Sequence, residues 1–372
     1  MALYLGLMSG TSLDGIDAVL VDFDLQPRSS IAVRAHRHSD FSAGLRAELL
    51  ALNTPGANEL ERAELAANAV ARAYADAVAG LLAQACLTTK DVVALGAHGQ
   101  TVRHRPGEFD GTGYTSQLLN GALLAELSGI DVVCDLRRRD VAAGGHGAPL
   151  APAFHAAAFG LEGETRAVLN LGGIANLTRL EGQVGAMGFD CGPASCLLDA
   201  WCERHLGLPF DDRGRWGASG RVDAALLASF LSEPYFALSP PKSTGRDLFH
   251  MGWLERHVEQ ASPDATAVDV QATLAALTVR TVADSVTRHA RAARALYVCG
   301  GGAENDALLQ GLAQALPGIR VLRTDTLGVP VDQVEAAAFA WLAMRFIERQ
   351  PGNLPRVTGA RGLRLLGALY PA

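Results

Sequence analysis

The chain has 372 residues, a length that favours two domains over a single compact core. Hydrophobic residues make up 49% and charged residues 19%, a balance that argues against a disordered chain. The formal net charge is −7, and basic residues are dispersed apart from Arg137, Arg138 and Arg139. A nucleic-acid-binding protein would normally have a basic face, so the composition argues against a nucleic-acid partner.

The sequence predicts a soluble, cytoplasmic protein without a membrane partner. No uninterrupted apolar run reaches the roughly 18 residues of a membrane span, and no basic segment precedes the first apolar residues as in a signal peptide. The six cysteines form no CxxC pair and lie mostly among apolar residues. They are therefore expected to be buried, reduced thiols.

The first half of the chain predicts a hairpin, a long helix and a further strand. Residues 3–8 and 16–23 are apolar runs around the turn "SGTSLDG", as in a β-hairpin. Residues 57–85 are rich in Ala and Leu, with charges at helical spacing. Residues 91–101 form a short apolar strand that ends at a Gly-His-Gly turn.

The second half repeats this order of elements. Residues 167–180 predict two strands around a Gly-Gly turn, residues 267–293 a long helix, and residues 295–306 a strand that ends at glycines. Side-chain identity is barely repeated, but the order is. This repetition predicts two similar α/β domains facing each other, with a ligand cleft between them.

The first hairpin turn has the composition of a phosphate-binding loop. Successive backbone N–H groups in such a turn form an anion-binding concavity, and nearby hydroxyl groups add donors. Glycine permits close approach of the backbone and positive φ angles. The glycines are Gly6, Gly10 and Gly15, and the hydroxyl side chains are Ser9, Thr11 and Ser12. An ordinary hairpin turn would have the same composition, so this alternative stays open.

Two further glycine turns favour a nucleotide. Gly172 and Gly173 form a matching turn in the second half. Gly300, Gly301 and Gly302 follow a strand and precede the helical segment 303–316, which would add the positive end of a helix dipole. The Walker A pattern and the protein-kinase signatures are absent. ATP would therefore bind to glycine turns from two domains, rather than to a P-loop or a protein-kinase fold.

Nine motifs along the chain resemble those of the anhydro-N-acetylmuramic acid kinase family, a branch of the sugar kinase, Hsp70 and actin superfamily. They are "GLMSGTSLDGID" (6–17), "AHGQT" (97–101), "ALLAELSGIDVV" (122–133), "RRRDVAAGGHGAPLAPAFH" (137–155), "LNLGGIANLT" (169–178), "GFDCGP" (188–193), "PPKSTGRDLF" (240–249), "VCGGGAEN" (298–305) and "EAAAFAWLA" (335–343). They cover nearly the whole chain in the order of the family.

This resemblance implies two duplicated ribonuclease-H-like domains flanking a nucleotide cleft. The expected domains are residues 1–135 with the C-terminal segment 355–372, and residues 136–354. The implied reaction opens the 1,6-anhydro ring of anhydro-N-acetylmuramic acid with water and transfers the γ-phosphoryl group of ATP to O6. The product would be N-acetylmuramic acid 6-phosphate, an intermediate of cell-wall recycling. Mg²⁺ and a homodimeric assembly are also implied.

The resemblance assigns nucleotide-binding residues to the hairpin and to the second glycine loop. The hairpin residues are Gly10, Thr11, Ser12, Leu13, Asp14, Gly15, Ile16 and Asp17, and the loop residues are Gly300, Gly301 and Gly302. Gly172 and Gly173 are also expected to bind the nucleotide, because their turn occupies the matching position in the second half of the chain. The metal ligands are left open.

The resemblance also assigns sugar contacts to Ser9, Arg139 and Glu335. A guanidinium group offers a bidentate fork to the lactyl carboxylate of the sugar, which suits Arg139. Glu335 has an alternative interpretation, because an acidic residue in the first turn of a helix is favoured by the helix dipole.

Asp190, in "GFDCGP", matches the general base of the family. A carboxylate within hydrogen-bond reach of a water can take its proton as the water attacks C1, as in an inverting glycosidase. From the residues alone, a turn residue ahead of Gly192 and Pro193 is the favoured interpretation of Asp190. Both interpretations stay open.

The histidines do not cluster in the sequence. His36 and His38 share one face of an expected strand and have no third partner, so no dedicated zinc site is expected. His98 could face the cleft, but a structural hydrogen bond from a turn histidine is the favoured interpretation.

The chain departs from the family pattern at three places, and two other functions stay open. His146 stands where the family has Gln, Ala194 and Ser195 replace Gly-Asn, and "SQLLNGALL" at residues 116–124 replaces a "QIGNPALL"-like segment. A kinase of another sugar is one alternative. A nucleotide-gated clamp or filament subunit is the other, although it would leave Asp190 and Arg139 without a task.

Overall fold

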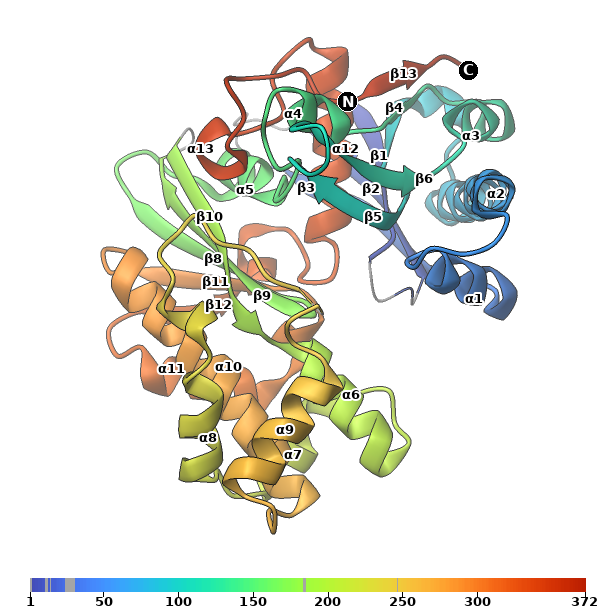
Figure 1. Cartoon of the computed structure of the whole chain (residues 1–372). Helices are drawn as coiled ribbons and strands as arrows, with labels where there is room; N and C mark the ends of the chain where they lie inside the picture. The colour runs from blue at the N-terminus through green and yellow to red at the C-terminus, as the bar shows by residue number, and fades with distance from the viewer. Residues whose placement is uncertain (1, 11–12, 14, 24–30, 183–184, 246) are drawn as a thin grey trace. The chain divides into compact units, whose positions relative to one another are not determined.

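The computed structural model divides the chain into two compact units. Unit 1 consists of Met1–Ala158 and Gln333–Ala372, and unit 2 of Phe159–Asp332. The structure describes residues 2–10, 13, 15–23, 31–182, 185–245 and 247–372. Figure 1 labels most of the helices and strands of each unit.

Unit 1 is built on a six-stranded sheet in the order β13-β7-β4-β1-β2-β3. Its strands are β1 (Leu3–Met8), β2 (Gly15–Asp22), β3 (Ala32–Asp40), β4 (Val92–Ala97), β7 (Val132–Cys134) and β13 (Ala368–Tyr370). The expected hairpin is β1 and β2, which pair antiparallel from Leu3↔Asp22 to Met8↔Asp17. A separate two-stranded sheet consists of β5 (Gln100–Pro106) and β6 (Gly113–Leu118).

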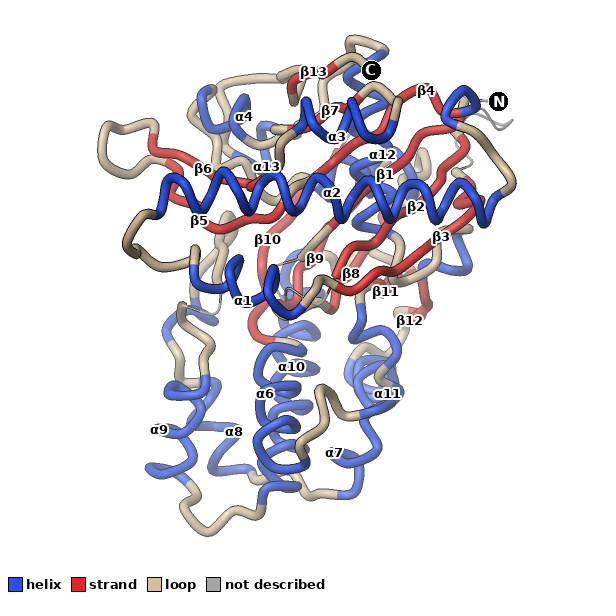
Figure 2. Tube along the Cα trace, turned by 90° about the vertical axis from the view of Figure 1, so that its right-hand side faces the viewer, coloured by secondary structure: helices blue, strands red, loops and turns tan. Residues whose placement is uncertain are grey.

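The helices of unit 1 include the long one expected from the sequence. They are α1 (Ala43–Ala51), α2 (Glu59–Ala85), α3 (Gly121–Ser128), α4 (Arg138–Ala142), α5 (Ala151–Phe159, whose last residue belongs to unit 2), α12 (Val334–Ile347) and α13 (Pro355–Thr358). Helix α2 runs across the sheet and packs against β2 and β3 (Figure 2). Val70, Tyr74, Val78 and Leu81 recur at helical spacing on its buried face.

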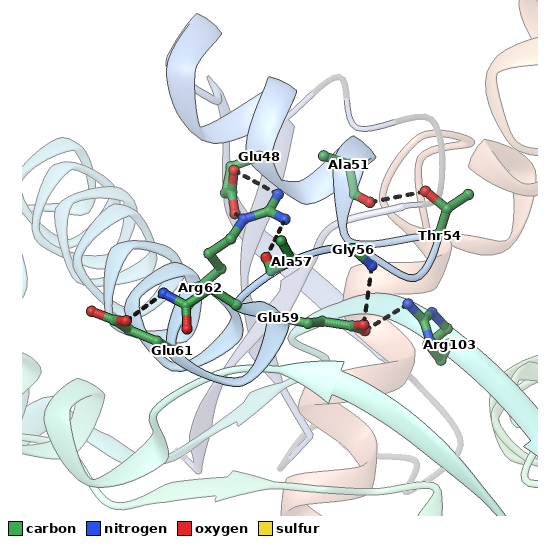
Figure 3. Close-up of polar contacts among 10 residues, drawn as sticks. Glu48, Ala51, Thr54, Gly56, Ala57, Glu59, Glu61, Arg62 and Arg103 are labelled. Atoms are coloured by element: carbon green, nitrogen blue, oxygen red, sulfur yellow. Dashed lines mark hydrogen bonds and ion pairs between the residues drawn. The ribbon is translucent and has the colours of Figure 1, made fainter.

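Ion pairs join α1, α2 and β5 at one end of this layer (Figure 3). Arg62 of α2 donates two hydrogen bonds to Glu48 of α1, with Nε–Oε1 2.7 Å and Nη2–Oε2 3.1 Å. Arg103 of β5 donates to Glu59, the first residue of α2, over 2.6 Å. The acidic Glu59 also lies at the end of the helix that favours negative charge.

Helix α12 returns from the end of the chain to pack against β1 and β4 of the first sheet. Gly6 of β1 and Gly96 of β4 are neighbours in the parallel ladder. A Cβ atom at Gly6 would lie 1.9 Å from the carbonyl oxygen of Ala336, and one at Gly96 would lie 2.0 Å from that of Phe339. The two glycines therefore let the backbone of α12 touch the sheet. The expected domain limits at residues 135 and 355 fall inside unit 1 because α4 and α12 belong to it.

Unit 2 has a five-stranded sheet in the order β10-β9-β8-β11-β12. Its strands are β8 (Thr165–Leu171), β9 (Ile174–Glu181), β10 (Gly185–Pro193), β11 (Ala295–Cys299) and β12 (Arg320–Arg323). Its α-helices are α6 (Ser195–Leu206), α7 (Arg215–Ser219), α8 (Ala224–Leu231), α9 (Met251–Ala261), α10 (Ala267–His289) and α11 (Asp306–Ala315). Short 3₁₀ segments lie at Thr89–Asp91 in unit 1 and, in unit 2, at Asp212–Gly214, Pro234–Ala237, Gly301–Glu304 and Thr324–Leu327.

The two sheets share one topology. In unit 1, β3-β2-β1 are antiparallel neighbours and β4 and β7 continue the sheet in parallel with β1. In unit 2, β10-β9-β8 are antiparallel and β11 and β12 continue in parallel with β8. The duplicated ribonuclease-H-like arrangement expected from the sequence is therefore confirmed.

Five cysteines are buried and not disulfide-bonded, whereas Cys86 is exposed at the C-cap of α2. The expectation of buried thiols is therefore wrong for Cys86, which follows the last turn of the helix. Within the described residues, none of the helices combines the length and the apolar character needed to cross a membrane.

Candidate active site

In unit 1, the start of the expected phosphate hairpin is held by a buried polar network. Thr11, Ser12 and Asp14 lie outside the described residues. Ser9 is buried, and its hydroxyl group is 2.8 Å from that of Tyr74 in α2. The Gly10 carbonyl accepts hydrogen bonds from the side-chain amide of Gln100 (3.0 Å) and from the Leu13 N–H (3.2 Å).

The remaining hairpin residues belong to the core or to strand β2. Leu13 is buried with a positive φ of 58°, which is unusual for a branched side chain. The Ile16 side chain is fully buried. Neither Gly6 nor Gly15 has the positive φ that the sequence suggested. A Cβ at Gly15 would instead lie 2.5 Å from the Ser39 carbonyl oxygen, so close strand packing explains this glycine.

Asp17 lies between two histidines of the neighbouring strand. Its Oδ1 is 3.1 Å from His36 Nε2 and 2.9 Å from His38 Nδ1. Burial alone would raise the pKa of Asp17, but the hydrogen bonds and charges of the two histidines outweigh it and lower the pKa. The expectation that these histidines have no third partner is therefore wrong. Across the ranges that the structure describes, no group of three or more His, Cys, Asp or Glu side chains has the geometry to hold a metal ion.

The glycine loops of unit 2 contain two kinds of glycine. A Cβ at Gly300 would lie 2.3 Å from Asn170 Oδ1, and one at Gly302 would lie 2.7 Å from Leu171 Cβ, so packing requires both. A Cβ at Gly301 would meet nothing within 4 Å. At Gly172 and Gly173 the nearest atoms would be 3.8 and 3.6 Å away, which is ordinary contact. Packing within unit 2 therefore does not require glycine at these three positions. Close approach of a ligand to the backbone is a physical reason to have glycine there.

The turn at Gly172 and Gly173 joins two strands, β8 and β9, as expected, whereas the loop at residues 300–302 differs from the expected turn leading into a helix. The 3₁₀ segment Gly301–Glu304 stands between β11 and α11, and Asn305 caps α11 by accepting a hydrogen bond from Leu308 N–H over 3.1 Å. The helical start expected at residue 303 is therefore wrong. In the other loop, the carbonyls of Gly172 and Gly173 accept from the N–H groups of Ala194, Ser195 and Cys196 at the start of α6.

Asp190 lies within strand β10, where the register against β9 shifts between Asp190 and Gly192. Its Oδ1 accepts a hydrogen bond from Asn176 Nδ2 (2.8 Å), and its Oδ2 accepts one from Thr244 N–H (3.0 Å). The backbone N–H of Asp190 donates to the Lys242 carbonyl, and Tyr235 donates its hydroxyl to the Asp190 carbonyl. Asp190 is therefore a strand residue with a fixed carboxylate rather than a turn residue.

The surroundings of this carboxylate favour a base of raised basicity. Burial raises the pKa of Asp190, and the hydrogen bonds from Asn176 and Thr244, with the charge of Lys242, only partly oppose the rise. A carboxylate has about four lone-pair directions, and two are used by these donors. Lone pairs therefore remain for a water hydrogen.

Of the three expected sugar-binding residues, Arg139 and Glu335 are exposed, whereas Ser9 is buried. Arg139 lies in the short helix α4, and Glu335 lies in the first turn of α12, where the helix dipole favours its charge. The preceding arginine, Arg137, behaves differently. Its guanidinium group donates to His98 Nε2 and to the Gly147 carbonyl (2.8 Å). Burial lowers the pKa of Arg137 to about 10 although the charge of Glu335 opposes this.

The residues that hold these groups in place are not evident from the sequence. Asn176 lies in the motif "LNLGGIANLT", but its pairing with Asp190 becomes visible only when the β9–β10 register is known. Asp140 is fully buried and accepts hydrogen bonds from Asn353, Thr358 and the Gly147 N–H. An acid between three arginines and an apolar, glycine-rich stretch gives little indication of a buried acceptor, and two of its partners, Asn353 and Thr358, lie far along the chain.

Solved structures of other proteins share the fold of this chain. One is the "Activator of the 2-Hydroxyisocaproyl-CoA Dehydratase from Clostridium difficile with bound ADPNP", with a TM-score of 0.50, 13% identity and coverage of 93% of this chain and 96% of that one. Another is the Acidaminococcus fermentans (R)-2-hydroxyglutaryl-CoA dehydratase component A, with a TM-score of 0.51, 12% identity and coverage of 91% and 96%. At this identity the likeness concerns the fold alone. With the duplicated sheets, it places the chain among the two-domain folds of the actin, Hsp70 and sugar kinase type.

Sequence relatives define the family within that class. The profile of the family described as "Anhydro-N-acetylmuramic acid kinase" matches residues 2–372. A relative of that name from Cupriavidus pinatubonensis is 58% identical over 370 residues, covering 99% of this chain and 98% of the relative. Another, from Variovorax paradoxus, is 56% identical over 375 residues, covering 100% and 99%. The chain belongs to the anhydro-N-acetylmuramic acid kinase family.

Proposed function

We propose that this chain is an ATP-dependent anhydro-N-acetylmuramic acid kinase of cell-wall recycling. The observation that carries the proposal is the full-length match to relatives of that name at up to 58% identity. In the proposed reaction, the oxygen of a water forms a bond to C1 and the bond from C1 to O6 breaks. O6 takes the γ-phosphoryl group of ATP, which leaves ADP and N-acetylmuramic acid 6-phosphate.

Asp190 is the proposed general base. It accepts the proton that the water loses as it attacks C1. Two fixed donors, Asn176 and the Thr244 N–H, support this role because they orient the carboxylate while leaving lone pairs for the water. The leaving O6 is captured by phosphorus, which reduces the need for a general acid.

Backbone N–H groups of the glycine loops are the proposed donors to the ATP phosphates. Gly301, Gly172 and Gly173 support this role because packing within unit 2 does not require glycine there. The hairpin residues 10–17 of unit 1 are also proposed to bind nucleotide phosphate. When bound, Mg²⁺ would neutralise phosphate charge. It commonly takes only one or two carboxylates, with phosphate oxygens and waters as its other ligands, so a dedicated cage of protein ligands is not required.

Ser9, Arg139 and Glu335 are proposed to contact the sugar. The exposed guanidinium group of Arg139 is accessible to a carboxylate, to which it could donate two parallel hydrogen bonds. We also propose a cytoplasmic homodimer, for which sedimentation should give about twice the 39.0 kDa of one chain. A mass of one chain at micromolar concentration would contradict the dimer.

The test of the reaction uses ATP, Mg²⁺ and anhydro-N-acetylmuramic acid in ¹⁸O-labelled water. Mass spectrometry should find the label in the C1 hydroxyl group and the phosphate on O6. Label in the phosphate would indicate ATP hydrolysis, and phosphate transfer without label at C1 would exclude attack by water. Turnover of a different sugar in preference would favour the alternative kinase, which His146 and the other departures motivate.

A further inference from the structure

A buried chain of hydrogen bonds in unit 1 links the nucleotide hairpin to Arg137. Arg137 Nε and Nη2 lie 3.1 and 3.0 Å from His98 Nε2. On the other side of the ring, His98 Nδ1 lies 3.2 Å from the carbonyl oxygen of Ser9. Neither Arg137 nor His98 is among the residues assigned to the nucleotide or the sugar.

The partners of His98 determine its tautomer. A guanidinium group can only donate, so Nε2 of His98 must accept and carries no proton. Nδ1 then carries the proton and donates it to the Ser9 carbonyl. Burial, followed by the charge of Arg137, lowers the pKa of His98 to about 3. The ring is therefore neutral at physiological pH, with one fixed tautomer.

The other groups around the ring leave this assignment intact. Phe339 of α12 packs on it with ring centroids 4.8 Å apart and adds no charge. Tyr74 reaches the same site through the Ser9 hydroxyl group, 2.8 Å away. Glu335 acts on Arg137, where its charge favours the protonated guanidinium. Arg137 therefore stays a donor.

The direction of the Ser9 carbonyl fixes the direction of the next N–H group. In a planar trans peptide, the C=O of Ser9 and the N–H of Gly10 point in opposite directions. Because the carbonyl points to His98, the Gly10 N–H points away from the ring. Gln100 fixes the following peptide group in the same way by donating to the Gly10 carbonyl over 3.0 Å.

We propose that His98, held in its Nδ1–H tautomer by Arg137, is a positioning residue that aims the Gly10 N–H at a nucleotide phosphate. This inference rests on the proposed function, in which Gly10 begins the phosphate-binding hairpin. His98 donates to the backbone and touches neither ATP nor sugar. Its contribution is preorganisation, since a fixed donor need not reorient when the phosphate binds.

Two substitutions of His98 distinguish the roles of its two ring nitrogens. Asn at position 98 can place an amide N–H near the position of Nδ1, whereas Gln places its amide near that of Nε2. His98→Gln loses the donor to Ser9 and should raise KM for ATP about tenfold, the effect of one lost buried hydrogen bond. His98→Asn should raise it by less than about threefold. Equal KM values for the two variants, at equal thermal stability, would overturn the proposal.

Nitrogen NMR of the full-length protein tests the tautomer without turnover. The ¹⁵N shifts of His98 should show a protonated Nδ1 and an unprotonated Nε2 from pH 5 to 8. In Arg137→Met, Nε2 loses its donor, so the ring should exchange between tautomers and KM for ATP should rise. A wild-type His98 that is charged or protonated at Nε2 at pH 7 would refute the inference, whatever the substrate. An Nδ1–H tautomer in a protein that binds no ATP would refute the proposed function and, with it, the phosphate role of His98.

Discussion

Opposing effects set the acidity of Asp190. Its burial favours the protonated form, and Asn176, the Thr244 N–H and Lys242 favour the ionised form, with burial the larger effect. A general base must be ionised, so kcat/KM should rise with pH through the pKa of Asp190. We expect this acid limb above pH 3.9, the usual value for Asp. A profile that is flat down to pH 4 would contradict a base of raised pKa.

Asn176 provides a matched test of that limb. Its hydrogen bond lowers the pKa of Asp190, so Asn176→Ala should move the acid limb to higher pH while leaving a carboxylate in place. The measurement is kcat/KM from pH 4 to 8 for both proteins. An unmoved limb would assign the titration to another group; His98 is an unsuitable candidate because its pKa is about 3.

Removing the carboxylate of Asp190 should remove the general base and slow the reaction. Asp190→Asn keeps the size of the side chain but cannot take a proton, so kcat should fall about 10²- to 10⁴-fold. KM values should change little, because Asp190 is proposed to act on the water rather than on ATP. A kcat within about threefold of the wild type would exclude Asp190 as the base.

At the scale of the elements, a substitution in the loop after β11 can distinguish a glycine needed for packing from one needed for ligand binding. Gly301→Ala adds a methyl group where no atom lies within 4 Å, so the free energy of unfolding should change by less than about 0.5 kcal/mol. The same methyl group should hinder a phosphate and raise KM for ATP about tenfold or more. Denaturant unfolding and ATP kinetics check the two statements. A stable variant with unchanged KM would remove Gly301 from the nucleotide site.

Where α12 packs against β4, we expect the opposite result: replacing a glycine should lower the stability of the protein. Gly96→Ala would place a methyl group 2.0 Å from the Phe339 carbonyl oxygen, and the helix backbone would have to move. We expect a loss of about 3 kcal/mol or more in the free energy of unfolding. Gly44→Ala in α1 is the control, because its methyl group meets nothing within 4 Å and alanine favours a helix by about 1 kcal/mol. Equal stability of the two variants would show that α12 does not touch β4 in this way.

The elements themselves could be predicted from local patterns, whereas the roles of their glycines could not. The hairpin of β1 and β2 and the long helices α2 and α10 follow from apolar periodicity within each segment. Gly6 suggested a phosphate turn, yet its neighbour is α12, more than three hundred residues further along the chain. Asp190 looked like a turn residue for the same reason, since its strand partner Asn176 is fixed only by register.

For the whole molecule, the repeated order of elements was sufficient to predict duplication but not the domain limits. The order of strands is set by local turns and crossovers, which leave traces in the sequence. The domain limits depend on the point at which the chain returns from unit 2 to unit 1. Helix α12 packs on the first sheet because Gly6 and Gly96 leave room for its backbone. The composition of α12 alone, rich in alanine, suits either unit.

The net charge of the whole chain bears on how it binds a polyanion. A protein of net charge −7 repels a triphosphate at long range, so binding should depend on local N–H donors and on a neutralising cation. Thermal unfolding with a non-hydrolysable ATP analogue at about 100 times its Kd should gain about 2.7 kcal/mol when Mg²⁺ is present. EDTA should remove most of this gain, and Gly301→Ala should reduce it. An equal gain with and without Mg²⁺ would show that the protein alone neutralises the phosphates.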